Sequence, residues 1–576
     1  MTQPGGESNV SLGPFTVYNH KTGIYASRLP PPKVPLTSVY DFCLGNVSFD
    51  DAGAAITICS TGQTISYGQL KLRSQQFGLG LLTKAKLKPG DTILVALHSS
   101  IDFAVCVMAA QFAGLQVALA NPDYARRELK HVYNLVKPKK VIIHSTHLGR
   151  AAAASIKTFT VVLTDTKLGR GGVLSIGELL ADEASAKAAK SYMPGDLNTT
   201  AYLPSSSGTT GLPKAVQISH KNLVSMLSMN LNIPGYIPDA LSGEQLRVLT
   251  FLPFFHAIGL VGQLHLVLKT RGQLFILRPF TPDSLCKAVP EHKINMIGMV
   301  PPALTKLMKH PGLSRDTFAT VKNVRCGGAP LDAETEAKFL QLTGVEVKQG
   351  WGMTELTVAG LDASSGQQTP GSVGCLIPGT LAKVVDVSTR EPVEPGQRGE
   401  LLIKGDQVFR GYVSNPEETK ASFTEDGFFR TGDIVTVDPR TGEFSIVDRL
   451  KELIKYQGYQ VAPADLEGVL ISHPKIAAAA VVGRYDKENG TELPCAFVEL
   501  SVDAQQQQHL SKHALAEEID QFVRSKVSHH KFLRGGIYFV DKVPVGASGK
   551  ILRKDVRAML KSLEQGQHVS LPRSNL

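Results

Sequence analysis

The stretch Ser205-Ser-Ser-Gly-Thr-Thr-Gly-Leu-Pro-Lys214 combines hydroxyl side chains, two glycines and a closing lysine. Gly208 and Gly211 allow the backbone to turn tightly and to approach an anion closely. The serine and threonine hydroxyls can donate hydrogen bonds to phosphate oxygens, and Lys214 adds a positive charge. The stretch therefore predicts a loop that binds the phosphates of a nucleotide.

The residues around this loop support the interpretation. Residues 200–203 are prone to form a strand, and Ser219 can cap a helix that runs from His220 to about Asn230. Strand, glycine-rich loop and helix in this order are typical of phosphate binding. The spacing is a poor fit to a P-loop ATPase, because the Walker loop has Gly-Lys-Ser/Thr together. A flexible Ser/Gly linker is disfavoured by the composition of residues 212–216, Leu-Pro-Lys-Ala-Val.

The composition is that of a globular protein with several domains. The chain has 576 residues, of which 43% are hydrophobic and 19% charged, so we expect two to four domains. Seven scattered cysteines, with no Cys-x-x-Cys pair and no Cys/His cluster at metal spacing, favour a reducing compartment and argue against structural zinc. There is no signal peptide pattern and no apolar run of about 18 residues, so we expect a protein without a membrane span.

The formal charge of +10 is concentrated near the C-terminus, where 11 Lys and Arg face 3 Asp and Glu from Arg524 onward. A basic segment of this kind can bind nucleic acid, but it lacks interleaved aromatic residues and any recognition motif. We therefore expect no nucleic acid partner. An anionic small ligand and a solvated basic face remain the two explanations.

The hydrophobic pattern predicts an α/β fold. Residues 1–36 are interpreted as an irregular lead-in, and residues 37–448 as a large N-terminal domain of two stacked α/β subdomains plus a small β-barrel within about 371–447. Residues 449–565 are predicted to form a smaller, mobile α+β C-terminal domain, followed by a tail at 566–576. Short buried strands are expected at 92–97, 116–120, 137–145, 160–164, 248–252, 273–277 and 296–300, and helices at 65–82, 102–113, 259–269, 464–470 and 510–527.

Six stretches follow one another in a fixed order. They are Ser205 to Lys214, Leu252-Pro-Phe-Phe-His, Gly327-Gly-Ala-Pro, Gln349-Gly-Trp-Gly-Met-Thr-Glu, Arg430-Thr-Gly-Asp with Asp448-Arg-Leu-Lys-Glu-Leu-Ile-Lys, and Pro544-Val-Gly-Ala-Ser-Gly-Lys. Together they resemble the adenylate-forming enzymes, which include acyl-CoA synthetases, peptide-synthetase adenylation domains and firefly luciferase. Within that superfamily the chain looks most similar to the 4-coumarate–CoA ligase group, over about residues 40–560.

The resemblance implies a two-step, ATP-dependent and AMP-forming acid–CoA ligase. A carboxylate attacks the α-phosphate of ATP and releases pyrophosphate, and the CoA thiol then displaces AMP from the acyl-adenylate. Because two anions must meet in the first step, fixed donors, cations and Mg²⁺ are needed where charge develops. By resemblance, Lys550 bridges the carboxylate and the α-phosphate, Thr354 binds the α-phosphate, and Glu355 is the magnesium ligand, as suits a hard oxygen donor.

Further nucleotide-binding positions follow from the same resemblance. Those expected to hold the β- and γ-phosphates are Ser206, Ser207, Gly208, Thr209, Thr210 and Lys214. Those expected around adenine are Gly328, Ala329, Pro330, Gln349, Gly350 and Trp351, whose indole can stack on the base. Asp433 is expected to bind the ribose hydroxyls, and Arg449 the ribose or a phosphate. Lys451 is expected at the hinge of the mobile domain. Lys455, Gly458 and Gln460 are expected near the nucleotide, and Gln457 in the CoA channel.

The acyl pocket departs from the coumarate ligases. Its expected residues are His256, Ile258, Gly259, Met353, Leu356 and Val358. His256 is interpreted either as a packed ring or as a catalytic base. Ile258 stands where those ligases carry a tyrosine that touches the phenol, and Gln457 replaces a lysine, so p-coumarate itself is in doubt. A less hydroxylated aryl acid or a medium-chain fatty acid fits as well.

Three alternatives stay open. The enzyme can be a stand-alone adenylation enzyme that loads a carrier protein, or, from another class, a non-catalytic basic binding protein. A luciferase is possible in principle. The last residues, Ser574-Asn575-Leu576, resemble the peroxisomal address Ser-Lys-Leu and suggest an import receptor as partner and a peroxisomal location, with the cytoplasm as the other choice.

Overall fold

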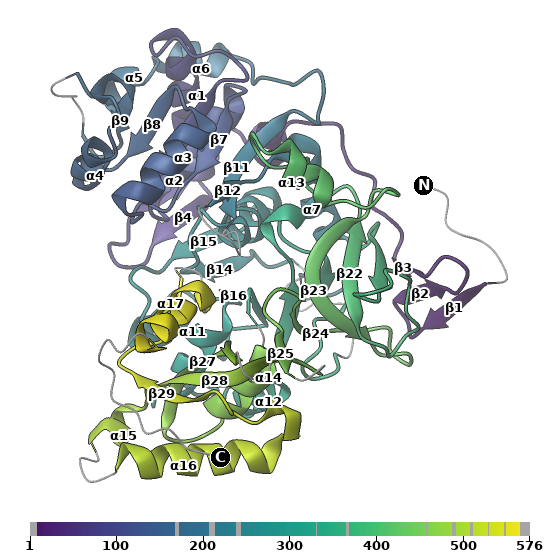
Figure 1. The fold of residues 1–576 in the computed structure, drawn as a ribbon. Coiled ribbons are helices and arrows are strands. Elements are labelled where there is room, and N and C mark those ends of the chain that lie inside the picture. Colours follow the sequence, from purple (N-terminus) through teal and green to yellow (C-terminus); the bar gives the residue numbers. More distant parts are fainter. Residues whose placement is uncertain are drawn as a thin grey trace. The chain divides into compact units, whose positions relative to one another are not determined.

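The computed structural model describes residues 8–166, 172–206, 213–237, 243–329, 331–363, 368–456, 459–486, 491–506, 511–527, 529–546 and 549–564. The chain divides into two compact units (Figure 1). The first consists of Met1–Lys383, Leu402–Arg430 and Pro439–Phe444, and the second of Val384–Leu401, Thr431–Asp438 and Ser445–Leu576. The predicted domain boundary at 448/449 stays a prediction, since the second unit also takes in two earlier segments.

One α/β layer of the first unit is built on a sheet in the order β10-β9-β8-β6-β7-β11-β12, with β13 beside β11. Neighbouring strands from β10 to β11 run parallel, as expected where helices cover a sheet. The strands are β6 (Thr92–Ala96), β7 (Gln116–Leu119), β8 (Lys140–Ile143), β9 (Val161–Leu163), β10 (Leu174–Ser175), β11 (Thr200–Ser206), β12 (Lys214–Ala215) and β13 (Ile218–Ser219). The helices of this layer include α1 (Tyr67–Thr83), α2 (Ile101–Phe112), α3 (Arg126–Val136), α4 (Leu148–Ala153), α5 (Ile176–Leu179) and α6 (Glu183–Ala188). Figure 1 shows α1, α2 and α3 grouped around this sheet, and α1 packs on α2.

The other α/β layer is a sheet in the order β20-β19-β18-β17-β16-β14-β15-β4-β5. Its central strands are short, apolar and buried on both faces, which is the pattern of a parallel sheet covered by helices. The strands are β4 (Ala54–Ile58), β5 (Thr64–Ser66), β14 (Arg247–Thr250), β15 (Gln273–Ile276), β16 (Met296–Met299), β17 (Asn323–Gly327), β18 (Val347–Trp351), β19 (Leu361–Asp362) and β20 (Cys375–Leu376). The helices include α7 (His220–Leu231), α9 (Leu266–Thr270), α10 (Pro282–Glu291), α11 (Pro301–Met308) and α12 (Ala333–Thr343). The two predicted α/β layers are therefore confirmed.

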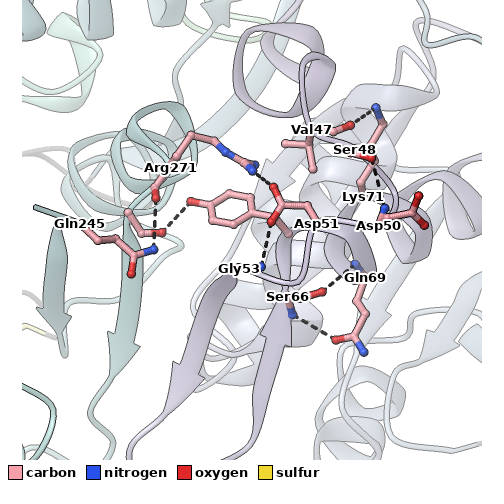
Figure 2. Close-up of polar contacts among 12 residues, drawn as sticks. Val47, Ser48, Asp50, Asp51, Gly53, Ser66, Gln69, Lys71, Gln245 and Arg271 are labelled. Carbon is pink, nitrogen blue, oxygen red and sulfur yellow. Dashed lines mark hydrogen bonds and ion pairs between the residues drawn. The ribbon is translucent and has the colours of Figure 1, made fainter. Parts of the chain in front are cut away.

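A cluster of polar contacts ties the start of α1 to the segment between α9 and β15 (Figure 2). Asp51 forms an ion pair with Arg271, whose guanidinium lies 3.9 Å from the centre of the Tyr67 ring. Ser66 and Gln69 form a capping box at the start of α1, where each side chain bonds to the other residue's backbone N–H. The sequence predicted this helix, but it gave no signal for the ion pair that holds its N-terminal end.

The prediction of an irregular lead-in is wrong for residues 9–27. These residues form β1 (Asn9–Leu12), β2 (Thr16–Asn19) and β3 (Ile24–Ser27), an antiparallel meander. Leu381–Lys383, at the start of β21 (Leu381–Val385), pair with β3. The region predicted as a small barrel or sheet also holds β22 (Gly399–Lys404), β23 (Phe429–Val437) and β24 (Phe444–Arg449).

The second unit contains a three-stranded sheet with helices on both faces. Its strands are β27 (Ile476–Asp486), β28 (Thr491–Leu500) and β29 (Gly536–Val540), and its helices α14 (Pro463–Ile471), α16 (Lys512–Lys526) and α17 (Arg553–Glu564). Ala479 and Val481 of β27 pack with α14 and α16, whereas Ala480 and Val482 pack with α17. Because alternate residues of a strand face opposite sides, α16 and α17 cover opposite faces of the sheet (Figure 1). The unit is the compact α+β fold that the sequence predicted.

Among the described residues, no helix has both the length and the apolar character needed to cross a membrane.

Candidate active site

Glu355 lies in the short helical turn η6 (Thr354–Leu356) that follows β18. Gly352 is required before this turn, because a Cβ at that position would come 1.9 Å from the carbonyl oxygen of Val358. Directly after the turn, Thr357 has a positive φ of 63°, and its hydroxyl donates a hydrogen bond to the carbonyl oxygen of Gln407 at 2.7 Å. The loop is thus folded back tightly, which fixes where the Glu355 carboxylate points.

The Glu355 carboxylate is buried, with 4% of the residue exposed, and it accepts two hydrogen bonds. Ser206 Oγ donates to its Oε1 at 2.9 Å and Tyr412 Oη donates to the same oxygen at 3.1 Å. Burial and the neighbouring Glu355 charge raise the pKa of the Tyr412 hydroxyl well above its usual value, so it remains a donor. Within the part of the chain that the structure describes, both bonds go to Oε1, so Oε2 is the oxygen that suits Mg²⁺.

Ser206 and Lys214 frame the glycine-rich loop. Ser206 and Lys214 are paired with each other across the antiparallel strands β11 and β12, so the loop between them begins and ends at the same place on the sheet. Lys214 Nζ lies 2.5 Å from Glu418 Oε1, at the start of α13 (Pro416–Ala421), and 5.0 Å from the centre of the Tyr412 ring. The predicted phosphate-binding residues Ser207, Gly208, Thr209 and Thr210 lie outside the described residues.

The residues expected around adenine lie at the carboxyl ends of β17 and β18. Gly328 has a positive φ of 88°, the left-handed conformation that glycine adopts without strain, and Ala329 follows it. Gln349 is buried, and its Nε2 donates to Leu331 O at 3.0 Å and to Glu336 Oε1 at 2.7 Å. The Gln349 amide therefore holds the backbone that follows the Gly-Ala turn. Pro330 lies outside the described residues.

Trp351 and Gly350 complete this strand end. A Cβ on Gly327 would lie 2.8 Å from the carbonyl oxygen of Gly350, so these strands approach closely. The Trp351 ring is buried against Gly360, where a Cβ would lie 2.9 Å from the indole. Stacking of this indole on adenine stays a prediction.

The predicted acyl pocket residues are brought together in part. Gly262 has Val358 and Ile258 as its neighbours, since a Cβ there would lie 3.6 Å and 3.8 Å from their side chains. Ile258 also packs against the apolar cluster of Leu252, Val300 and Ala303. His256 and Met353 are half-buried, Gly259 is buried, and Leu356 is fully buried.

The ring of His256 lies 4.7 Å from that of Phe255. Gly259 has no space for a side chain, because a Cβ would come 2.2 Å from the carbonyl oxygen of Pro253. The described side chains around Ile258 are apolar, whereas His256 carries a polar ring whose catalytic role stays a prediction.

Asp433 is a buried carboxylate of the second unit that pairs with the half-buried Arg449. Arg449 Nε donates to Asp433 Oδ1 at 3.1 Å, and Asp433 is only 2% exposed. The backbone N–H of Asp433 donates to Thr431 Oγ1 at 3.1 Å. A carboxylate accepts hydrogen bonds at both of its oxygens, which is the chemistry that the predicted ribose contact requires.

The predicted site lysines of the second unit come from two separate segments. Lys550 is half-buried, and its carbonyl oxygen accepts a hydrogen bond from Gly546 N at 2.7 Å. Lys455 is exposed on β25 (Ile454–Tyr456), opposite Gln460 of β26 (Tyr459–Val461), and Lys451 is exposed before them. Gln457 and Gly458 lie outside the described residues.

Several polar groups of the structure were not predicted from the sequence. Tyr412 and Glu418 lie outside the six motifs, and no spacing pattern connects them with Glu355 or Lys214. His98, Asp123 and His147 follow β6, β7 and β8, and their ligand atoms lie within 4.8 Å of one another, although the sequence shows no metal spacing. Asp123 is paired with Arg150 at 2.8 Å, and burial together with Arg278 lowers the pKa of His98 to about 4.

Comparison with known proteins places the chain in a family. The family of AMP-binding enzymes matches residues 48–413, and the C-terminal domain of AMP-binding enzymes matches residues 465–550. The chain belongs to the AMP-binding enzyme family.

Individual relatives match over nearly the whole chain. It is 32% identical to 4-coumarate-CoA ligase 1 of Narcissus pseudonarcissus, over 95% of this chain and 98% of that protein. It is 34% identical to phenylacetyl-CoA ligase epaB of Aspergillus niger, over 87% of this chain and 92% of that protein. The crystal structure of an ATP-bound RpMatB-BxBclM chimera superposes with a TM-score of 0.79 at 27% identity, over 91% of this chain and 99% of that one. These findings confirm the predicted family, the fold class and the class of enzyme, an ATP-dependent, AMP-forming ligase.

Proposed function

We propose that this protein joins a carboxylic acid to coenzyme A at the expense of ATP, which is cleaved to AMP and pyrophosphate. The single observation that carries the proposal is the buried Glu355 carboxylate, held by Ser206 and Tyr412 at the point where the phosphate loop begins. Relatives named as 4-coumarate–CoA and phenylacetyl–CoA ligases support CoA as the acceptor.

In the first step, the chain's own residues reduce the repulsion between the carboxylate and the triphosphate. Lys214 donates to the β- and γ-phosphates, Ser206 holds the Glu355 carboxylate beside them, and Thr354 donates to the α-phosphate. Glu355 would hold Mg²⁺, which supplies positive charge against the phosphate oxygens. Lys550 adds its ammonium at the bond that forms, between the carboxylate oxygen and the α-phosphorus.

In the second step, the thiol of CoA attacks the acyl carbon and AMP leaves. No nucleophilic side chain is required for this exchange, because the thiol is the nucleophile. Asp433 and Arg449 hold the ribose throughout, and movement of the residues that follow Lys451 withdraws Lys550 after adenylation.

The substrate is an aryl acid of the phenylpropanoid or phenylacetic type, or a medium-chain fatty acid. Ile258 and Val358 offer only apolar surface, so a substrate hydroxyl at this place would lose its hydrogen bond to water without a replacement. We therefore expect aryl acids without a para hydroxyl to be preferred over p-coumarate.

The test is an assay with ATP, Mg²⁺, CoA and a panel of aryl, medium-chain and long-chain acids, with the thioesters identified by mass. Thioester formation is expected in the wild type, and Glu355→Gln is expected to lose about 10²-fold or more of the rate. Glu425→Gln, an exposed carboxylate of the same unit, is the matched control. Acid-dependent exchange of pyrophosphate into ATP without any thioester would instead select the enzyme that loads a carrier protein. Salt-sensitive binding to duplex DNA without ATP turnover would select the basic binding protein.

We further propose a peroxisomal location through the terminal Ser574-Asn575-Leu576, read by an import receptor. The support is the likeness of these residues to Ser-Lys-Leu. A fluorescent protein carrying the last residues of this chain is expected in peroxisomes, and a variant without Leu576 in the cytoplasm. Cytoplasmic fluorescence of both would refute the proposal.

A further inference from the structure

Arg553 is a half-buried cation that lies three residues after Lys550, at the start of α17. Its guanidinium forms two ion pairs, Nη1 with Glu452 Oε2 at 3.0 Å and Nη2 with Glu467 Oε2 at 2.6 Å. The side chains of the three residues are only 13%, 17% and 8% exposed. One arginine therefore joins two carboxylates that come from different parts of the second unit.

The two carboxylates connect Arg553 with the segments that surround it. Glu467 lies in α14, and its other oxygen accepts a hydrogen bond from Val481 N of β27 at 2.8 Å. Glu452 lies in the turn after the proposed hinge residue Lys451, and its N–H donates to Arg449 O at 2.9 Å. Asp448 adds a third carboxylate, which is buried and accepts hydrogen bonds from the N–H groups of Arg449 and Ala464.

The backbone between Lys550 and Arg553 is short and well fixed. Val545 and Ile551 form a β-bridge, and Leu552 N donates to Pro544 O at 2.9 Å. Val556 and Leu560 of α17 are buried against the sheet. A displacement of the Arg553 guanidinium would therefore also displace Lys550.

We propose that Arg553 is a positioning residue that locks the Lys550 segment to the turn containing Glu452 and to α14, so that Lys550 is presented for adenylation. This inference rests on the proposed role of Lys550 in the first step. A buried arginine suits the task because its planar fork binds two carboxylates in fixed directions, whereas a lysine is a single flexible point charge. Arg553 itself touches neither substrate nor nucleotide in this proposal.

Comparing adenylate formation with thioester formation distinguishes a positioning role of Arg553 from a general loss of structure. Arg553→Gln is expected to lower acid-dependent ATP–pyrophosphate exchange at least about 10-fold, because the loss of one partner of a buried ion pair disturbs its surroundings strongly. Thioester formation from supplied acyl-adenylate should change by less than about 3-fold, since Lys550 is not needed there. Arg553→Lys should give an intermediate rate of exchange. Lys554→Gln removes an exposed charge of the same helix and should leave both rates unchanged.

Variants at the acidic partner keep the test decisive if Arg553→Gln does not fold. Glu452→Gln retains an acceptor for Arg553 but removes the charge, and it should lower exchange more than thioester formation. Equal losses in both half-reactions, or unchanged exchange in Arg553→Gln or Glu452→Gln, would overturn the inference. If Lys550→Ala itself left exchange unchanged, the proposed role of Lys550 would be wrong. Loss of exchange in Lys550→Ala with normal exchange in Arg553→Gln would refute only the role of Arg553.

Discussion

Tyr412 donates a hydrogen bond to the same oxygen of Glu355 that Ser206 binds, although 57 residues separate Tyr412 from Glu355. The phenol therefore helps to fix the orientation of the carboxylate together with Ser206. A hydroxyl whose pKa is raised by burial and by the Glu355 charge does not ionise at neutral pH. Tyr412 belongs to the site as much as the motif residues do.

Tyr412→Phe is expected to slow adenylate formation by about 10-fold, because a hydrogen bond to a charged group is worth on the order of 1.5–3 kcal/mol. The Mg²⁺ concentration needed for half-maximal exchange should rise, since the carboxylate loses one of its two anchors. Steady-state ATP–pyrophosphate exchange at varied Mg²⁺ measures both effects. Tyr485→Phe, at an exposed tyrosine, is the control. A normal rate with a normal Mg²⁺ requirement would show that Tyr412 only fills space.

Glu418→Gln tests whether Glu418 and the ATP phosphates compete for Lys214. The ammonium is held 2.5 Å from Glu418 Oε1 in a partly exposed pair, so the cost of exchanging partners is modest. We expect the KM for ATP to fall about 2- to 5-fold with kcat nearly unchanged. Glu417→Gln removes the neighbouring exposed charge and should have no effect. A higher KM would mean that Glu418 orients Lys214 for ATP.

The sequence predicted the family and many site residues because the glycine, threonine and carboxylate positions recur within short motifs. Ser206 and Glu355 were each predicted, and the structure brings them within 2.9 Å. Their shared partner Tyr412 was not predicted, because a single tyrosine outside a motif carries no local signal. The cluster around Arg553 was missed for the same reason, since Glu452, Glu467 and Arg553 meet only after the second unit has folded.

The strands β1 to β3 were missed although the sequence carried a signal for them. Gly13 and Gly23 adopt positive φ angles of 66° and 63° in the two turns of the meander. Each strand has only four residues, which is too short for the alternation of apolar and polar positions to stand out. The Pro-Pro-Pro run at 30–32 is typical of irregular structure, and it favoured that prediction for all of residues 1–36.

Asp51→Asn is expected to destabilise the first unit by about 1–2 kcal/mol. Asp51 pairs with Arg271 and also accepts from Gly53 N at 2.8 Å, so the substitution weakens a charge-assisted contact and a turn together (Figure 2). Urea unfolding followed by the fluorescence of Trp351 reports on this unit. Asp50→Asn, at the exposed neighbour, should lie within about 0.5 kcal/mol of the wild type. Equal effects of the two substitutions would show that the ion pair contributes nothing.

The stability of the second unit is expected to fall as the pH rises from about 4.5 to about 7. Burial raises the pKa of Glu467 to about 7 and that of Asp448 to about 6, above their usual values. The folded state therefore binds more protons than the unfolded state in this window, and this contribution to stability is lost as the pH passes the folded pKa values. For Glu467 alone the change is on the order of 3 kcal/mol.

Hydrogen exchange of the Val481 amide, which donates to Glu467 Oε1, measures this stability at each pH after correction for the intrinsic exchange rate. Glu467→Gln should flatten the dependence, because the amide side chain does not titrate. Glu517→Gln, at an exposed carboxylate of α16, should keep the wild-type slope. A wild-type protection that rises from pH 5 to pH 7 would mean that Arg553 outweighs burial and that Glu467 is ionised throughout this range.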